Sequence, residues 1–314
     1  MKVLFLSQRV PYPPDRGDRI TTFHFLRHLV DSGARVRVGC LAEEPQDAAS
    51  VADLRGWVDD VCAPEIHRTT RKLTSLRNLL TTAPLTTAFF WHRTLQRTVD
   101  RWVHEDPPDL VYVYSSSMAQ FALPHRGPVR LMQFAELDSD KWRQYAENSR
   151  GPAAWIYRRE AHRLLEFERR VAREFDVSVV VSEVEKDLFQ QRIPGVVPEV
   201  LPNGVDVDHF RSRGDSAREP HTVVFTGVMD YEPNVQGVLW FVRECWPALR
   251  REFADAKLLV VGSRPVESIR RLAGSDGIEV TGRVAEIPPY LDTAAAAIAP
   301  LHMARGVQNK VLEA

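Results

Sequence analysis

The sequence predicts an α/β protein in which two domains are each built on a parallel sheet. Short apolar runs alternate with amphipathic stretches, which is the pattern of a sheet that helices cover on both faces. The length of 314 residues exceeds that of a typical single domain. A polar stretch at residues 211–220 separates two series of strands and helices. These three observations favour two α/β halves over one larger core.

The first series begins with the apolar run 3–6. A helix is expected at about 21–32, because apolar residues share one face there and Gly33 supplies an end signal. Further strands are expected at 36–41, 110–114, 130–134 and 177–181, and a long charged helix at about 153–174 precedes the last of them. Ligands of parallel sheets bind at the carboxyl ends of the strands, so the loops after these runs are candidate sites.

The second series follows the segment Pro202-Asn203-Gly204-Val205-Asp206, and we place the domain boundary there, giving domains 1–203 and 204–314. Its expected strands are 222–225, 257–261, 278–280 and 296–299, and its expected helices are about 235–252, 266–273 and 287–294. Residues 307–314 resemble the first two turns of a helix that no cap or glycine ends. We therefore expect the second domain to be truncated at its carboxyl end.

Composition excludes several classes of protein. Lys plus Arg is 41 and Asp plus Glu is 42, so no overall field attracts nucleic acid. The three cysteines lack the C-x-x-C spacing of a zinc site or a disulfide framework, and a reducing cytoplasm fits them best. The run Val3–Leu6 is too short for a signal peptide, and no run approaches the ~20 apolar residues of a membrane span.

Six segments in order resemble the family-4 glycosyltransferases, and more narrowly the sugar transferases associated with bacterial exopolysaccharide synthesis. The first three segments are Pro11-Tyr12-Pro13-Pro14 with Gly17-Asp18-Arg19, Asp138-Ser139-Asp140-Lys141-Trp142, and Ser182-Glu183-Val184-Glu185. The other three are Pro202-Asn203-Gly204-Val205-Asp206, Asp230-Tyr231-Glu232-Pro233-Asn234, and the run from Gly306 to Ala314. The pentapeptide ending at Asp206 is the most specific of them.

The resemblance implies a GT-B fold, in which two facing Rossmann-like domains bind an acceptor and a nucleotide-sugar donor. It also implies transfer with retention at the anomeric carbon, to a glycan or lipid-linked acceptor, without a metal or other cofactor. The residues agree with the absence of a metal. Asp138 and Asp140 flank Ser139, but Lys141 follows immediately, which is unlike a site for a hard cation. We expect a cytoplasmic enzyme and leave open a peripheral contact with the inner face of the plasma membrane.

The carboxyl-terminal segment carries the main candidates for binding the donor. Gly306 lets the backbone approach a phosphate closely, Lys310 adds a positive charge, and Glu313 one turn later could accept hydrogen bonds from ribose hydroxyls. The alternative is an ordinary Lys-Glu pair on a solvated helix face. By resemblance, Glu313 is the second of two glutamates that lie eight positions apart, and Arg305 occupies the position of the first.

A second candidate loop for phosphate follows the strand at 222–225. By resemblance Gly227 begins this loop, and Val228 stands where many relatives carry arginine, so backbone amides and Asn234 would bind instead. Arg264, which follows another strand, could substitute for the missing positive charge, or it could be merely solvated. In the first domain we expect Gly17 and Asp18 in a long loop that approaches the diphosphate, unless that loop is only a flexible connection.

Catalysis is expected to rest on electrostatic stabilisation, because a front-side displacement needs no enzyme nucleophile. By resemblance a histidine follows the strand at 130–134, and here Glu136 or Asp138 would hold sugar hydroxyls in its place, unless either caps the next helix. Residues 67–95 mix basic and apolar side chains, which suits a membrane surface or, more commonly, a helix with a buried leucine face. Two other functions stay open: a non-hydrolysing nucleotide-sugar epimerase, and an inactive nucleotide-sugar-binding assembly protein.

Overall fold

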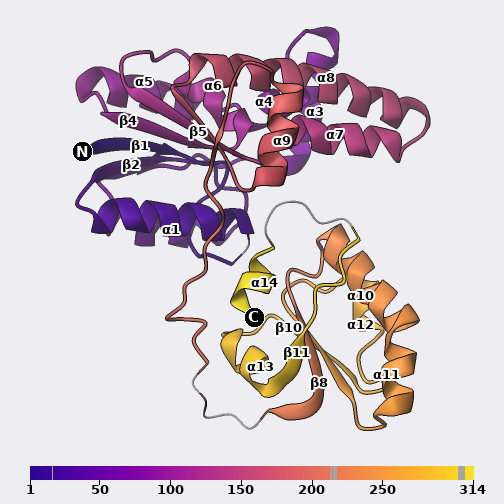
Figure 1. Cartoon of the computed structure of the whole chain (residues 1–314). Helices are drawn as coiled ribbons and strands as arrows, with labels where there is room; N and C mark the ends of the chain where they lie inside the picture. Colours follow the sequence, from indigo (N-terminus) through magenta and orange to yellow (C-terminus); the bar gives the residue numbers. More distant parts are fainter. Residues whose placement is uncertain (16, 213, 215–217, 303–307) are drawn as a thin grey trace. The chain divides into compact units, whose positions relative to one another are not determined.

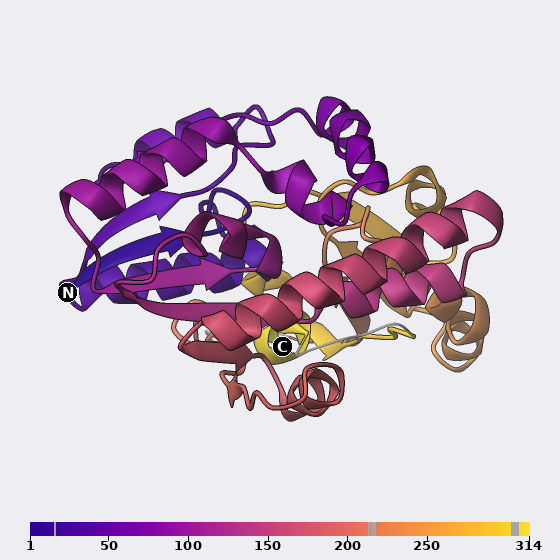
Figure 2. The same cartoon turned by 90° about the horizontal axis from the view of Figure 1, so that it is seen from above.

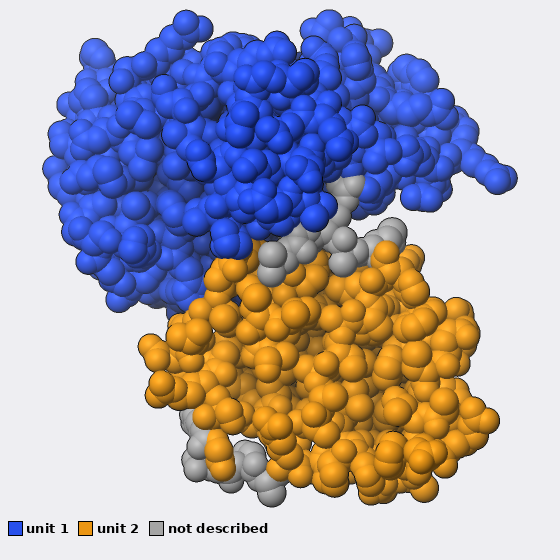
Figure 3. All heavy atoms as spheres, viewed as in Figure 1, with its two compact units in different colours: residues 1–202 blue, residues 203–314 orange. Residues whose placement is uncertain are grey.

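The structure is a computed structural model that describes residues 1–314 except 16, 213, 215–217 and 303–307 (Figure 1). Its internal contacts divide the chain into two compact units, which Figure 3 colours separately. Unit 1 comprises Met1–Pro202 and unit 2 comprises Asn203–Ala314. Each unit has its own sheet and its own apolar core, and each is described by itself.

Unit 1 contains a seven-stranded parallel sheet in the order β3-β2-β1-β4-β5-β6-β7. The strands are β1 Lys2–Leu6, β2 Arg35–Gly39, β3 Asp60–Cys62, β4 Leu110–Tyr114, β5 Val129–Ala135, β6 Val177–Val180 and β7 Glu199–Val200. The strand order grows outward in both directions from the adjacent pair β1 and β4. Such a reversal is a topological switch point, where the loops after the two strands separate and leave room for a ligand.

Both faces of this sheet are buried at its centre, which explains why the adjacent strands β1 and β4 are largely apolar. Val3 and Phe5 of β1 pack on one face with Leu26 of α1 (Gly17–Asp31), while Leu4 and Leu6 pack on the other with α5 (Arg93–Glu105). Figure 1 shows α1 and α5 on opposite sides of the sheet. The remaining helices of unit 1 are α2 Asp47–Leu54, α3 Arg68–Ser75, η1 Leu76–Leu80, α4 Leu85–Phe90, η2 Ser116–Met118, α6 Ala119–Ala122, α7 Asp138–Glu147, α8 Gly151–Glu174 and α9 Glu183–Arg192.

The first helix begins four residues earlier than expected. Gly17 is its first residue and therefore does not lie in a loop, which corrects the expectation of a long glycine-containing loop. The hydroxyls of Thr21 and Thr22 donate to the carbonyl oxygens of Gly17 and Asp18, at 3.1 and 2.8 Å. These bonds occupy hydroxyls that would otherwise compete with the helix backbone, so two poor helix formers are tolerated in the first turns.

Unit 2 contains a four-stranded parallel sheet in the order β10-β9-β8-β11. The strands are β8 Glu219–Thr226, β9 Lys257–Val261, β10 Ile278–Gly282 and β11 Ala294–Ala297, and the helices are α10 Glu232–Glu244, α11 Trp246–Glu252, α12 Glu267–Arg270, α13 Pro288–Thr293 and α14 Asn309–Glu313. Phe225 packs on the face covered by α10, α11 and α12, and its neighbour Val224 packs on the face of α13. The adjacent strands β8 and β11 form the switch point of this sheet.

Three sequence expectations for unit 2 are corrected. The helix expected at 235–252 is two helices, because the chain breaks at Cys245 and Pro247 lies in the first turn of α11. The helix expected at 266–273 is the single turn of α12. The last strand begins at Ala294, two residues earlier than expected, in an alanine run whose weak hydrophobicity carries little periodic signal.

No helix in the part of the chain that the structure describes is long and apolar enough to cross a lipid bilayer.

Candidate active site

The loops after β1 and β4 meet at the switch point of unit 1. The Gln8 side-chain amide, just after β1, donates to the Ser117 hydroxyl after β4 at 2.8 Å. Ser115, the first residue after β4, has φ of 72°, and Ala135 at the end of β5 has φ of 59°. Such left-handed conformations cost non-glycine residues on the order of 1–3 kcal/mol each and cluster at functional sites. The carboxyl edge of this sheet is therefore a candidate site on backbone geometry alone.

Asp138 is the polar centre of this edge. Its carboxylate accepts hydrogen bonds from the hydroxyls of Ser115 and Ser116, at 3.3 and 3.4 Å, and from the Lys141 ammonium at 3.0 Å. Leu137 occupies the N-cap position of α7, so Asp138 is not the capping residue. The side chain of Asp138 keeps 22% of its surface exposed, which leaves it within reach of a ligand hydroxyl.

A fully buried carboxyl lies behind Asp138. Glu168 of α8 has no exposed surface and accepts hydrogen bonds from the Ser139 backbone amide, at 3.2 Å, and from the Ser139 hydroxyl. Burial raises the pKa of Glu168 to about 8, and the negative charge of Asp138 adds to this rise. Glu168 thus anchors the first turn of α7, and with it the position of Asp138.

Tyr114 at the end of β4 lies among three of the acidic candidates. Burial raises the pKa of its phenol, and the charges of Asp18, Glu136 and Asp138 raise it further. The structure thereby brings the two expected catalytic residues and Asp18 to one edge of the sheet. Asp18 is also paired with the Arg9 guanidinium.

Gly17 adjoins this group, but a Cβ built on it would meet nothing within 4 Å. Steric crowding therefore does not require glycine at this position, and its candidacy rests on resemblance alone.

In unit 2, two glycines lie against each other at the carboxyl ends of β8 and β9. Gly227 and Gly262 both have φ of 154°, and a Cβ added to Gly262 would lie 1.7 Å from the Gly227 carbonyl oxygen. The Gly227 amide donates to the Val261 carbonyl oxygen at 3.0 Å. Only glycine lets the two turns approach this closely. The Gly262 amide donates to the Gly282 carbonyl oxygen at 3.2 Å, so the amides of both glycines are already hydrogen-bonded, which is contrary to the expectation that the Gly227 amide would bind a phosphate.

Lys310 lies beside this pair of turns. Its ammonium donates to the Asn234 side-chain oxygen at 2.7 Å and lies 4.2 Å from the centre of the Phe225 ring. The Asn234 side chain in turn donates to the Val228 carbonyl oxygen at 2.9 Å. Burial lowers the pKa of Lys310 to about 8, against a smaller opposing effect of Glu313. The structure thus brings together Gly227, Asn234 and Lys310.

Glu313 follows Lys310 by one turn of α14. Burial raises the pKa of the Glu313 carboxyl, while the charges of Lys310 and His209 oppose that rise. Arg264, after β9, has φ of 56°, and its Nε lies 3.4 Å from the Asp230 carboxylate. Gly306 lies outside the described residues.

Two models of known protein families match the chain. The model described as Glycosyl transferase 4-like domain matches residues 17–204, which is more than half of the chain, and the model described as Glycosyl transferases group 1 matches residues 220–314. The chain belongs to the glycosyltransferases. It is therefore a member of a family of enzymes that transfer sugars. A search of curated proteins found no match.

Several solved structures share the fold of this chain. Sucrose-phosphate synthase from Thermosynechococcus elongatus is 13% identical, with a TM-score of 0.65 over 96% of this chain and 76% of that one. TarM is 7% identical, with a TM-score of 0.61 over 94% and 79% of the two chains, and apo OtsA is 11% identical, with a TM-score of 0.54 over 93% and 76%. Together with the parallel sheets of both units, these matches confirm the predicted GT-B fold.

Several residues of this glycosyltransferase were not expected from the sequence. Ser115 and Ser116 directly follow an apolar strand, a position that would have identified them. Gly262 also follows a strand, but its contact with Gly227 joins residues far apart in the chain. Glu168 carries no local signal, because a glutamate within a long charged helix is ordinarily solvated.

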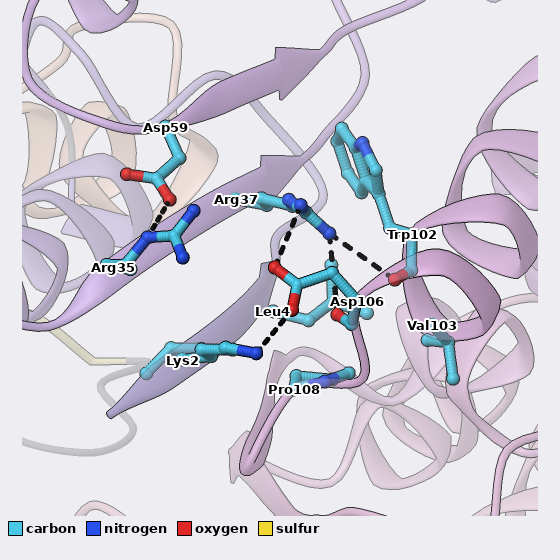
Figure 4. Close-up of a pocket in the computed structure, with 10 residues that line it drawn as sticks. Lys2, Leu4, Arg35, Arg37, Asp59, Trp102, Val103, Asp106 and Pro108 are labelled. Carbon is cyan, nitrogen blue, oxygen red and sulfur yellow. Dashed lines mark hydrogen bonds and ion pairs between the residues drawn. The ribbon is translucent and has the colours of Figure 1, made fainter.

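A small hollow lies at the amino edge of the unit 1 sheet, at the end opposite to the candidate site (Figure 4). Lys2 and Arg37 both bind the Asp106 carboxylate, and Arg35 binds Asp59 at 2.8 Å. The enclosed volume is about 10 Å³, room for about one water molecule. These ion pairs hold strand ends together and leave no space for a nucleotide sugar. Among the described residues, no group of three or more His, Cys, Asp or Glu side chains is placed to hold a metal ion.

Proposed function

We propose that this glycosyltransferase takes a sugar from a nucleotide-sugar donor and transfers it, with retention, to a glycan or lipid-linked acceptor in bacterial exopolysaccharide synthesis. The observation that carries the proposal is the placement of the Lys310 ammonium beside the two glycine turns. A Cβ on Gly227 would lie 3.3 Å from the Lys310 nitrogen, so the cation adjoins the backbone at the carboxyl end of β8. A diphosphate is the part of the donor that such a cation would bind.

The charge of Lys310 fits this role. Its lowered pKa of about 8 means that burial disfavours the ammonium more than the charge of Glu313 favours it. A bound diphosphate would compensate for this burial and keep the lysine charged. Glu313, one turn away, would accept hydrogen bonds from the ribose hydroxyls, so the two residues would bind adjacent parts of one nucleotide.

The carboxyl edge of unit 1 supports binding of the reacting sugars. In a front-side displacement the acceptor oxygen forms a bond to the anomeric carbon as the bond to the diphosphate oxygen breaks, and the acceptor proton passes to the departing diphosphate. Asp138 and Glu136 would hold sugar hydroxyls during this step and stabilise the developing positive charge on the sugar ring. Three donors already fix the orientation of Asp138, so it would need little reorganisation.

A basic and apolar surface in unit 1 supports contact with a membrane. Leu73, Leu76 and Leu80 of α3 and η1 are 65%, 43% and 93% exposed, so the expected buried leucine face is wrong for them. Basic side chains intersperse these leucines: Arg68, Arg71, Lys72 and Arg77. Exposed leucines among cations suit the interface of an anionic bilayer, where a lipid-linked acceptor and its enzyme would meet at the cytoplasmic face.

The test combines binding and transfer. Wild-type protein and the variants Lys310→Ala and Lys257→Ala are titrated with UDP, GDP and dTDP, then incubated with radiolabelled sugars of these nucleotides and bacterial membrane lipids. Lys257 lies at the amino end of β9 and is exposed, so it controls for loss of one positive charge in unit 2. We expect nucleotide affinity to fall about tenfold or more in Lys310→Ala alone, as for loss of one charged contact.

Each product identifies a function. Labelled lipid or glycan with the same anomeric configuration as the donor supports the proposal. Inverted product contradicts retention, isomerised donor without transfer indicates an epimerase, and nucleotide binding without turnover indicates an inactive assembly protein.

The membrane proposal has a separate test. Sedimentation with vesicles of phosphatidylcholine and phosphatidylglycerol should recover the wild type but not Leu76→Asp/Leu80→Asp, and recovery of both would contradict a role for this surface.

A further inference from the structure

A cluster of aromatic rings lies on the helical hairpin of unit 1. Helices α7 and α8 pack side by side and extend beyond the sheet (Figures 1 and 2). The ring centres of Trp142, Tyr145 and Tyr157 are 5.5 to 6.0 Å apart in all three pairs. None of the three belongs to either apolar core cluster of this unit, and Tyr145 is 49% exposed. The rings therefore pack against one another at the surface.

Polar groups adjoin this aromatic cluster. An open hollow of about 460 Å³ lies between the two helices, and it is lined by Arg143, Ala146, Glu147, Ser149, Arg158 and Ala161. Tyr145 and Tyr157 each precede a lining residue by one position. Within the described residues, the hydroxyls of Tyr145 and Tyr157 and the exposed Arg158 have no hydrogen-bond partner, so they are available to a ligand. The surface thus combines flat apolar rings with free donors and acceptors.

The cluster is continuous with the candidate site. Asp138, Trp142 and Tyr145 are spaced by four and three residues, so they lie along one face of α7. At 1.5 Å of rise per residue, the path from Asp138 to Tyr145 is about 10 Å. An elongated ligand that reaches Asp138 with one end can therefore contact the rings with the next part of its length.

We infer that this hairpin surface binds the non-reacting sugars of the acceptor, which is then an oligosaccharide of at least two residues. This inference rests on the proposed function, since it extends the acceptor end of the same site. A pyranose ring presents an apolar face of C–H groups and a rim of hydroxyls, which match a tyrosine or tryptophan face and the neighbouring arginine, glutamate and serine. A lipid chain would need a continuous aliphatic surface, and the charged lining of the hollow does not provide it.

The inference is tested by binding of immobilised glycans in the absence of any donor. An array of fragments of bacterial capsular and extracellular polysaccharides is probed with wild type, Tyr145→Ala/Tyr157→Ala and Tyr145→Phe/Tyr157→Phe. We expect wild type to bind some fragments of two or more sugars. Loss of both rings should weaken binding about tenfold, equivalent to about 1.4 kcal/mol. The phenylalanine variant keeps the rings and should retain most of the binding.

Trp155→Ala is the matched control. Trp155 is 59% exposed on α8 and precedes Tyr157 by two residues, so it points to the other side of that helix. Unchanged circular dichroism and UDP affinity in every variant would exclude misfolding. No glycan binding by wild type, equal binding by the alanine variant, or equal loss in Trp155→Ala would overturn the inference. Sedimentation with phosphatidylglycerol vesicles that depends on Tyr145 and Tyr157 would overturn it in favour of lipid.

The array tests this inference independently of the proposed function, because glycan binding needs neither a donor nor turnover. A protein that binds glycans through the hairpin but transfers no sugar would keep this inference and contradict the proposed reaction.

Discussion

The buried carboxyl of Glu168 gives the sharpest prediction about stability. In the folded protein its pKa lies at about 8, compared with an ordinary value of 4.5, and burial is the main cause. The folded state therefore retains a proton that the unfolded chain releases. The resulting stabilisation is complete below pH 4.5 and is lost as the pH rises through about 8. The variant Glu168→Gln cannot ionise, so it should lack this part of the pH dependence.

The magnitude follows from the pKa difference. One pKa unit corresponds to about 1.4 kcal/mol, so between pH 4.5 and pH 7 the wild type should lose about 3 kcal/mol of stability through this group. The glutamine oxygen can still accept the Ser139 amide, and its own amide can donate to the Ser139 hydroxyl. We therefore expect Glu168→Gln to be more stable than wild type at pH 7, by up to about 3 kcal/mol, and similar to it near pH 4.5.

Urea-induced unfolding followed by tryptophan fluorescence at several pH values measures this difference. Glu166→Gln serves as the control, because Glu166 lies on the same helix but is half exposed and pairs with Arg169. If the loss of a negative charge alone changed the stability, both variants would change by a similar amount. Parallel curves of stability against pH for wild type and Glu168→Gln would refute the argument, since they would mean that the carboxyl does not change protonation on unfolding.

Three further predictions concern the two candidate edges. Gly262→Ala should lower the melting temperature more than Gly274→Ala. Both glycines have positive φ, but only the Gly262 variant adds a Cβ against the Gly227 oxygen, an overpacking that typically costs about 1–3 kcal/mol. Equal shifts in melting temperature would contradict this. Nucleotide affinity of wild type, measured by calorimetry, should fall from pH 7 to pH 9 as Lys310 loses its proton, whereas Lys310→Arg should show no such fall. Asp138→Asn should lower kcat about a hundredfold or more at unchanged UDP affinity, and an unchanged kcat would exclude a role in the reaction.

Much of the fold could be predicted from the sequence because buried parallel strands are apolar on both faces. The bounds of β4 and β9 match the expected runs, since both strands consist of a short and largely apolar run. In contrast, β3 and β7 have three and two residues, which is too short for any periodicity to be recognised. The leucines of α3 and η1 show that spacing predicts a helix better than it predicts which of its residues are buried. Their spacing suits burial, but spacing alone does not tell whether another element covers that face.

Several residues of the candidate site in unit 2 could be predicted from local motifs, but their contacts with one another could not. Gly227 and Asn234 were expected from one loop and Lys310 from the carboxyl-terminal segment, and the structure adds that the lysine nitrogen contacts the asparagine beside that glycine. The long-range partners could not be found in this way. Phe225 beneath Lys310 is one example, because sequence spacing does not specify which side chains meet after folding.

Backbone conformation gives independent support to the two edges. Among the described non-glycine residues, positive φ occurs at Ser115, Ala135, Arg264 and Asp276, and the first three lie at or just beyond the carboxyl ends of β4, β5 and β9. Nothing about sheet formation requires strain at these ends, since glycine would relieve it. Non-glycine residues in such conformations cluster at functional sites. The Ser115 side chain brings its hydroxyl to Asp138, and the Arg264 side chain brings its guanidinium to Asp230, beside the glycine turns that adjoin Lys310.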